Sequence, residues 1–173
     1  LPGGSVQTLR QILDRLRATY CRKVGVEFTH VQDPGRKAWL QRRLRMPYAR
    51  FAGASDAIWG NALLSRYPIV AGEVVRLPRE GVPLRRNALR AELDLGAGRR
   101  LSVVVTHLHH VEGPDGDRVR LAQVPRLLDL VAGRPATVLM GDLNAEPGSA
   151  EIGLLRSVGM ADAFTAAGGG PAD

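Results

Sequence analysis

The sequence predicts an α/β protein, because stretches with helical spacing of apolar residues alternate with short runs of β-forming residues. Helical spacing is clear in residues 6–21, 33–45 and 117–132. Short β-like runs, separated by turns rich in glycine and proline, recur along the chain from Tyr48 to Met140. The 173 residues are 45% hydrophobic, which is enough for one domain with a packed core.

The helices are predicted from their apolar stripes and from the signals at their ends. The first covers residues 6–21, and the second, residues 33–45, begins with an Asp-Pro pair suited to N-cap and N1. The third covers residues 117–132 and ends at Gly133, and a short fourth helix is expected over 150–158. The expected buried side of the third helix comprises Val119, Leu121, Val124, Leu127, Leu128 and Val131.

Six strands are predicted, over residues 48–51, 61–65, 73–77, 88–95, 101–107 and 136–140. Residues 88–95 alternate between apolar and polar types, which indicates a strand with one solvated face. Residues 101–105 are almost continuously apolar, which is typical of a strand buried on both faces. Gly96–Arg100 is expected to join these two strands as a hairpin, and residues 166–173 to form a flexible loop.

The formal net charge of +7 and the sequence pI of about 10.6 favour an anionic partner, such as nucleic acid, phosphorylated lipid or a membrane surface. No apolar run reaches the roughly 18 residues of a membrane span. Cys21 is the single cysteine, so a disulfide within the chain is excluded. No targeting segment is visible, so the sequence indicates no compartment.

The run Gly141-Asp142-Leu143-Asn144 follows a predicted strand and carries the strongest functional signal. Side chains two residues apart share one face of an extended chain, so Asp142 and Asn144 are expected to converge. A carboxylate accepts a proton or holds a metal ion, and a carboxamide donates a hydrogen bond to an anion. The alternative is that both residues only shape a turn, as Asp and Asn often do.

Two further segments carry candidate polar groups. His107 and His109 follow the predicted strand 101–107 and share a face if that strand continues, which suggests phosphate or metal contact. No third ligand with zinc spacing follows, so a zinc site is disfavoured. Asn61 precedes an apolar strand and is suited to orient a partner side chain, while Arg66 fits an ion pair or an anion contact equally well.

Residues 60–69 (GNALLSRYPI), 106–108 (THL) and 141–144 (GDLN) together resemble the endonuclease/exonuclease/phosphatase family over about residues 44–165. That family includes deoxyribonuclease I, abasic-site endonucleases, neutral sphingomyelinases and inositol polyphosphate 5-phosphatases. The resemblance implies a four-layer α/β/β/α sandwich of the deoxyribonuclease I type. It also implies phosphoester hydrolysis with Mg²⁺ (or Mn²⁺) as the cofactor.

The resemblance assigns expected roles residue by residue. Asp142 matches the family's Asp that orients or deprotonates the attacking water, and it is a weak candidate metal ligand. Asn144 matches the Asn that binds the scissile phosphate and steadies that Asp, and His107 matches a phosphate-contacting position. Arg86 lies near a basic position that some members use, with Arg85 an equal candidate. The expected phosphate-binding set is Asn61, Arg86 and His109.

Two parts of the family pattern have no match in this sequence. The Glu that is the family's main metal ligand follows a Gln; Glu27 is the nearest candidate, but its neighbours differ. The family's Ser-Asp-His motif is absent as well. We therefore expect a sandwich incomplete at both ends, whose open sheet edges a partner chain or a second copy would cover. Weak or no phosphodiesterase activity is expected from this chain alone.

Residues about 7–43 resemble a different protein, a segment of the decarboxylase component of 2-oxoglutarate dehydrogenase. The matching runs include residues 9–13, 24–31 and 39–43. This favours a hybrid chain, in which residues 1–45 are a helical segment of separate origin and 46–173 a partial phosphoesterase domain. No thiamine-pyrophosphate motif is present.

The leading hypothesis is a metal-dependent phosphoester hydrolase that acts on nucleic acid, a phospholipid head group or an inositol phosphate. One alternative is a non-catalytic domain that binds anions or a partner, and another is a fragment of a 2-oxoglutarate dehydrogenase-like protein. Metal binding near Asp142 separates the enzyme from the non-catalytic domain.

Overall fold

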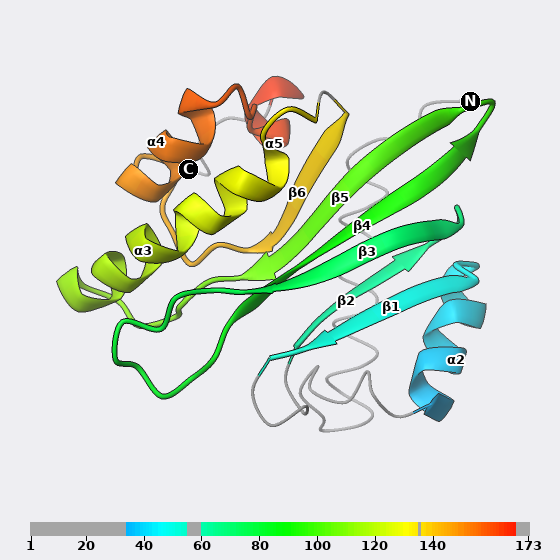
Figure 1. Ribbon diagram of the computed structural model, residues 1–173, viewed down its shortest axis with the longest axis horizontal. Helices are drawn as coiled ribbons and strands as arrows, with labels where there is room; N and C mark the ends of the chain where they lie inside the picture. The colour runs from blue at the N-terminus through cyan, green and yellow to red at the C-terminus, as the bar shows by residue number, and fades with distance from the viewer. Residues whose placement is uncertain (1–33, 55–59, 135, 169–173) are drawn as a thin grey trace.

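The computed structural model describes residues 34–54, 60–134 and 136–168, which form a mixed α/β fold (Figure 1). The elements follow the order α2 (Pro34–Leu44), β1 (Tyr48–Gly53), β2 (Gly60–Ser65), β3 (Ile69–Arg76), β4 (Asn87–Gly96), β5 (Arg99–His107), α3 (Pro114–Val131), β6 (Thr137–Asp142), α4 (Ala150–Ser157) and α5 (Ala163–Ala166). The helix expected over 6–21, together with Cys21 and Glu27, lies outside the described residues.

The described strands form two sheets. Strands β1 and β2 make an antiparallel pair, and the other four lie in the order β3-β4-β5-β6. Strands β3, β4 and β5 are antiparallel, whereas β5 and β6 are parallel and joined through α3. In the parallel pair Thr106 faces Gly141 and His107 faces Asp142. Both strands therefore end at the same edge of the sheet, each with a polar side chain.

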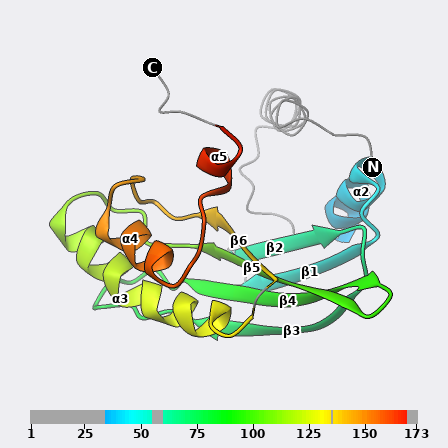
Figure 2. The same ribbon diagram turned by 90° about the horizontal axis from the view of Figure 1, so that it is seen from above.

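The elements stack in four layers, as the sequence resemblance implied (Figures 1 and 2). Helices α3 and α4 cover one face of the four-stranded sheet, the β1–β2 pair covers the other, and α2 contacts β1. The first core, between the helices and the large sheet, includes Leu77, Ala88, Val104, Leu108, Val124, Leu127, Leu130, Val131 and Leu155. The second core, between the two sheets, includes Ala52, Leu63, Leu89, Ala91, Leu93, Val103 and Val105.

Alternation along β4 and β5 sends neighbouring side chains into different cores. Val104 packs in the core under the helices, while Val103 and Val105 pack between the sheets, so the predicted burial of β5 on both faces is confirmed. The solvated face predicted for β4 is confined to its second half. Ala88 is buried beneath the helices, whereas Arg90 on the same face is only half-buried and pairs with Glu73 at 2.6 Å.

Several predicted boundaries shift because long-range pairing outweighs local pattern. Strand β3 begins at Ile69 rather than residue 73, since Ile69 pairs with Leu93 across the sheet. Helix α3 begins at Pro114, three residues before the expected start, with a proline in its first turn. The short α5, which the sequence analysis did not predict, takes in Ala166, the first residue of the predicted tail. It is capped by Asp162, whose carboxylate accepts from the backbone N–H groups of residues 164 and 165.

The buried side of α3 also differs from the apolar stripe. Leu121 and Leu128 are only half-buried, and Leu130 is buried instead. Two polar residues, Arg120 and Gln123, are also buried on this helix. Within the described residues, no helix is both long enough and apolar enough to cross a membrane.

Candidate functional site

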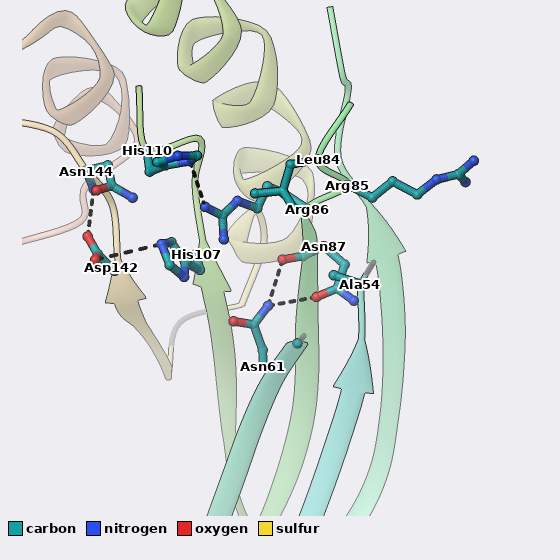
Figure 3. A pocket seen from close by; sticks show the side chains of 11 residues that line it. Ala54, Asn61, Leu84, Arg85, Arg86, Asn87, His107, His110, Asp142 and Asn144 are labelled. Atoms are coloured by element: carbon teal, nitrogen blue, oxygen red, sulfur yellow. Dashed lines mark hydrogen bonds and ion pairs between the residues drawn. The ribbon is translucent and has the colours of Figure 1, made fainter. Parts of the chain in front are cut away.

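A cavity of about 400 Å³ opens at the carboxyl ends of β5 and β6, beside the ends of β1 and β2 (Figure 3). Five of the six predicted site residues line it, namely Asn61, Arg86, His107, Asp142 and Asn144. The remaining lining residues are Ala54, Gly60, Leu84, Arg85, Asn87 and His110. The sequence prediction that Asp142, Asn144 and His107 converge on a shared cavity is therefore met by the geometry.

The β5–β6 pairing places His107 beside Asp142. The two are register partners, and Nε2 of His107 lies 3.8 Å from Oδ2 of Asp142. Gly141 permits this close approach, because its φ is 130° and a Cβ there would lie 1.8 Å from the backbone oxygen of Thr106. Glycine before Asp142 is thus required by the contact between the strands.

Asn144 fixes the other side of the Asp142 carboxylate. Its backbone N–H donates to Oδ1 of Asp142 at 3.0 Å, and its Nδ2 donates to the backbone oxygen of Leu108 at 3.1 Å. Asn144 adopts a left-handed φ of 48°, a conformation that Asn tolerates better than most residues. The turn and the functional interpretation are therefore compatible, since the turn itself orients the carboxylate and leaves Oδ2 facing His107.

Asn61 and Asn87 form the floor of the cavity where the two sheets meet. Nδ2 of Asn61 donates to the side-chain oxygen of Asn87 at 2.7 Å and to its backbone oxygen at 2.9 Å. Nδ2 of Asn87 donates to the backbone oxygens of Ala52 and Gly53, at 3.2 and 2.8 Å. Both donors of Asn61 are thereby used, so the group that Asn61 offers to the cavity is its Oδ1 oxygen, an acceptor.

Arg86 supplies the positive charge at the mouth of the cavity. Its Nη2 lies 3.4 Å from Nδ1 of His110, and its Nε is buried without a hydrogen-bond partner among the described residues. Burial lowers the pKa of Arg86 and the nearby Asp142 carboxylate acts in the opposite direction, yet a guanidinium stays charged near neutral pH. In Figure 3 Arg86 turns toward His110, whereas Arg85 extends away from it.

His107 lies in surroundings that favour its neutral form. Burial lowers its pKa most, the charge of Arg86 lowers it further, and His110 acts in the same direction. The Asp142 carboxylate raises it, without reversing the net effect. With a pKa below the usual value near 6.5, His107 is neutral at physiological pH and offers one N–H donor.

The structure does not bring His109 to the cavity. The strand ends at His107, so the alternation that would align His109 with it stops there. His109 is 4% exposed, its backbone N–H donates to Oε1 of Gln123 at 3.0 Å, and its ring packs edge-to-face on His110 at 5.4 Å between centroids. Burial lowers the pKa of His109. His110 lines the cavity in its place, a contact that sequence reasoning missed.

A buried ion pair braces the segment that follows β5. Nε of Arg120 on α3 lies 3.0 Å from Oε1 of Glu151 on α4, and both side chains are almost fully buried. Nη1 of Arg120 also donates to the backbone oxygens of His109 and Val111, at 3.1 and 2.8 Å. Arg120 therefore holds residues 109–111, and with them His110, against the two helices.

The cavity contains oxygen donors of the type that Mg²⁺ prefers, but few carboxylates. Among the described residues, Asp142 is the only carboxylate that lines it, and they contain no group of three His, Cys, Asp or Glu side chains placed to hold a metal ion. One carboxylate and the acceptor oxygen of Asn61 fit a weak Mg²⁺ site that a substrate phosphate completes. They do not make a preformed three-ligand site.

The family model of the Endonuclease/Exonuclease/phosphatase family matches residues 8–172, and the chain belongs to this family. As its name states, the family comprises nuclease- and phosphatase-type hydrolases, which act on phosphate-bearing substrates. The match also covers most of the N-terminal region that sequence analysis assigned to a separate origin. The proposed boundary near residue 45 stays a prediction.

Solved structures support the same fold. An endonuclease/exonuclease/phosphatase from Beutenbergia cavernae is 26% identical with a TM-score of 0.65, and the similarity covers 76% of this chain and 41% of that one. The catalytic domain of human Nocturnin is 23% identical with a TM-score of 0.63, over 80% of this chain and 57% of that one. This chain therefore spans about half of the length of these relatives or less.

Similarity to 2-oxoglutarate dehydrogenase is present too, as the sequence suggested. The E1/E2 component from Corynebacterium glutamicum is 30% identical over 162 residues, which is 87% of this chain and 12% of that protein. The E1 component from Brucella anthropi is 47% identical over 50 residues, 29% of this chain and 5% of that protein. Because the similarity covers only 12% and 5% of these proteins, their dehydrogenase activity is not assigned to this chain.

Proposed function

We propose that this chain is a phosphodiester hydrolase in which Asp142, Asn144 and His107 are the catalytic residues and Arg86 binds the phosphate. The observation that carries the proposal is the meeting of a carboxylate, an imidazole and a guanidinium in one cavity. The groups around a reacting phosphate must include a proton acceptor and fixed donors for the equatorial oxygens. Here Asp142 is the acceptor, and Arg86 and His107 are the donors.

The proposed reaction is direct attack by water on phosphorus. Oδ2 of Asp142 accepts a proton from the attacking water, while the N–H of Asn144 holds Oδ1 and so keeps the carboxylate in position. The P–O bond to the leaving alcohol breaks as the new bond forms, and the alkoxide takes up a proton from solvent. General-base assistance of this kind contributes about 10²–10⁴-fold.

A divalent cation, Mg²⁺ or Mn²⁺, completes the proposal. Asp142, with the Oδ1 oxygen of Asn61, would hold it together with the substrate phosphate. When bound, the cation supplies a Lewis acid at a phosphoryl oxygen. Because Asp142 is the only lining carboxylate among the described residues, we expect the affinity for the cation and the turnover to be low.

Two side chains are proposed in roles that differ from those the family resemblance implies. Asn61 is proposed as a cation or hydroxyl acceptor rather than a phosphate donor, because both of its N–H groups already donate to Asn87. His110 replaces His109 as the second imidazole near the phosphate. Nucleic acid, a phospholipid head group and an inositol phosphate all supply the required phosphate. A partner chain along the open sheet edges stays a prediction.

Hydrolysis of bis(p-nitrophenyl) phosphate tests the proposal. We expect slow release of nitrophenol that requires Mg²⁺ or Mn²⁺ and falls about 100-fold or more in Asp142→Asn. Asp129→Asn, an equivalent change on the exposed side of α3, should leave the rate unchanged. Metal-independent turnover, or equal rates in Asp142→Asn and the parent chain, would overturn the assignment of Asp142.

The described residues place a single carboxylate in the cavity lining, which also favours a second candidate, a domain that binds phosphate without turning it over. In that case inorganic phosphate binds, Arg86→Ala weakens the binding, and no nitrophenol is released at any metal concentration. Calorimetric titration with phosphate, run beside the hydrolysis assay, separates the two functions.

A further inference from the structure

A second cavity, of about 280 Å³, adjoins the first and is lined by four arginines. It is formed by Arg76, Arg79, Arg85 and Arg86, together with Gly53, Ala54, Val74, Leu77 and Asn87. Ala54, Arg85, Arg86 and Asn87 also line the first cavity, so the two share a wall. No carboxylate lines this second cavity among the described residues.

The loop that carries these arginines is anchored on several sides. At its base the backbone N–H of Leu77 donates to the oxygen of Arg86 at 3.0 Å, which brings the two ends of the loop together. Leu77 is buried in the core, and Nε2 of Gln123 on α3 donates to the oxygen of Pro78 at 3.1 Å. Arg79, Arg85 and Arg86 are therefore presented by a braced loop at the end of the β3–β4 pair, and Arg76 is the last residue of β3.

Two acidic residues close in sequence to these arginines are paired elsewhere. Glu80 lies 3.5 Å from Arg118 on α3, and Glu73 lies 2.6 Å from Arg90 on β4. Neither carboxylate lines the second cavity, which is left with an excess of positive charge. Guanidinium groups bind phosphate well, because their forked donors match two phosphate oxygens.

We propose that the second cavity binds a second phosphate of the same substrate, next to the one in the first cavity. This inference rests on the proposed function of the first cavity. Arg85 and Arg86 line both cavities, and Arg86 is placed to contact both phosphates, while Arg76 and Arg79 line the second cavity alone. The substrate is accordingly a molecule with two or more phosphates, either adjacent along a nucleotide chain or attached to one small ring.

The test compares ligands that carry one and two phosphates. Calorimetric titration in EDTA, where nothing is hydrolysed, is run with thymidine 5′-monophosphate and with thymidine 3′,5′-bisphosphate. We expect the bisphosphate to bind about 10-fold more tightly, and the salt slope of its binding to be steeper by about one. In Arg76→Ala/Arg79→Ala the bisphosphate advantage should fall to about twofold or less, with affinity for the monophosphate unchanged.

Arg66→Ala/Arg99→Ala is the matched control. It removes the same charge from exposed positions near the opposite end of the strands, so it should keep the bisphosphate advantage. Equal affinity for both ligands in the parent chain, or an equal loss in both double variants, would overturn the second site. A different result would show that the first cavity does not bind phosphate: monophosphate binding would then be unchanged in Arg86→Ala.

Two further ligands identify the source of the second phosphate. Octathymidylate places its phosphates along a chain, and myo-inositol 1,4-bisphosphate places them on one ring. A preference for either over the monophosphate that is lost in Arg76→Ala/Arg79→Ala supports the site and names its ligand. If neither ligand binds more tightly than the monophosphate, the second site is contradicted.

Discussion

The side-chain amide of Asn61 on β2 donates two hydrogen bonds to Asn87 on β4, and so joins the two sheets directly beneath the candidate site. Asn87 is 2% exposed, and its side-chain amide donates to the backbone oxygens of Ala52 and Gly53 on β1. The hydroxyl of Thr106 on β5 also donates to the backbone oxygen of Asn87, at 3.1 Å. One buried residue thus ties together strands from both sheets.

Asn87→Ala should lower the free energy of unfolding by about 2–4 kcal/mol, because two backbone oxygens lose their donor and the amide of Asn61 loses one of its two acceptors. Urea unfolding followed by circular dichroism measures the change. Ser102→Ala is the control, since the buried hydroxyl of Ser102 has no hydrogen-bond partner in the described part of the chain. That variant should be neutral or slightly stabilised. A loss in Asn87→Ala no larger than in Ser102→Ala would contradict the bridging role.

The pKa of His107 should respond in opposite directions to its two charged neighbours. Arg86→Ala removes a positive charge and should raise the pKa toward its usual value, whereas Asp142→Asn removes a negative charge and should lower it further. Titration of the His107 ring proton by NMR follows both changes. Arg66→Ala, at the far end of β2, should leave the pKa unchanged. The reverse order of the two variants would refute the arrangement of charges around His107.

Stability should fall as the pH falls below about 6.5. His107 and His109 both have a lowered pKa in the folded chain, so the unfolded chain binds protons first and is favoured in acid. The stability that the two neutral histidines contribute is fully present above their pKa in the unfolded chain. It is lost as the pH falls toward their lower pKa in the folded chain. Urea midpoints at about pH 7.5 and about pH 5.5 measure the loss. His107→Asn/His109→Gln should reduce it. The lowered pKa of Asp162 acts only in more acidic solution.

Gly141→Ala should destabilise the chain by about 2–4 kcal/mol, because a methyl group would collide with the Thr106 oxygen and the φ of 130° strains any other residue. Chemical unfolding gives the difference. Gly148→Ala is the matched control, since a Cβ at Gly148 meets nothing within 4 Å. Similar stabilities for the two variants would show that β5 and β6 separate at little cost.

Arg120→Met should cost about 3–5 kcal/mol, because Glu151 is then left charged and buried without its partner. The control lies on the same helix, where Arg126 and Asp129 form an exposed pair at 3.1 Å. Arg126→Met should change the unfolding free energy by less than about 0.5 kcal/mol. Equal changes in the unfolding free energy of the two variants would mean that burial of the Arg120–Glu151 pair does not determine how much it stabilises the fold.

The sequence predicts those parts of the site that depend on local pattern. His107 and Asp142 end strands of distinctive composition, and Asn144 follows Asp142 by two residues, so their placement at one sheet edge follows from strand prediction and family resemblance. Burial of β5 on both faces is predicted from its almost continuous apolar run, residues 101–105. The four layers follow from the family resemblance rather than from pattern alone.

The rest depends on contacts between distant residues. His110 rather than His109 reaches the cavity because β5 stops at His107, and a single sequence does not show where a strand stops. The role of Asn87 arises from carbonyl groups on β1, 34 and 35 positions earlier in the chain. Arg120 breaks the apolar stripe of α3 because its partner, Glu151, is on another helix.

The spacing between His107 and Asp142 is set by the hydrogen-bonded ladder of two neighbouring strands and not by any loop. The arginines of the second cavity, by contrast, lie largely on the connection between β3 and β4. In the proposed arrangement, catalysis and substrate recognition therefore lie on separate parts of the fold. We expect insertions or exchanges in that connection to alter the choice of substrate while His107 and Asp142 keep their spacing.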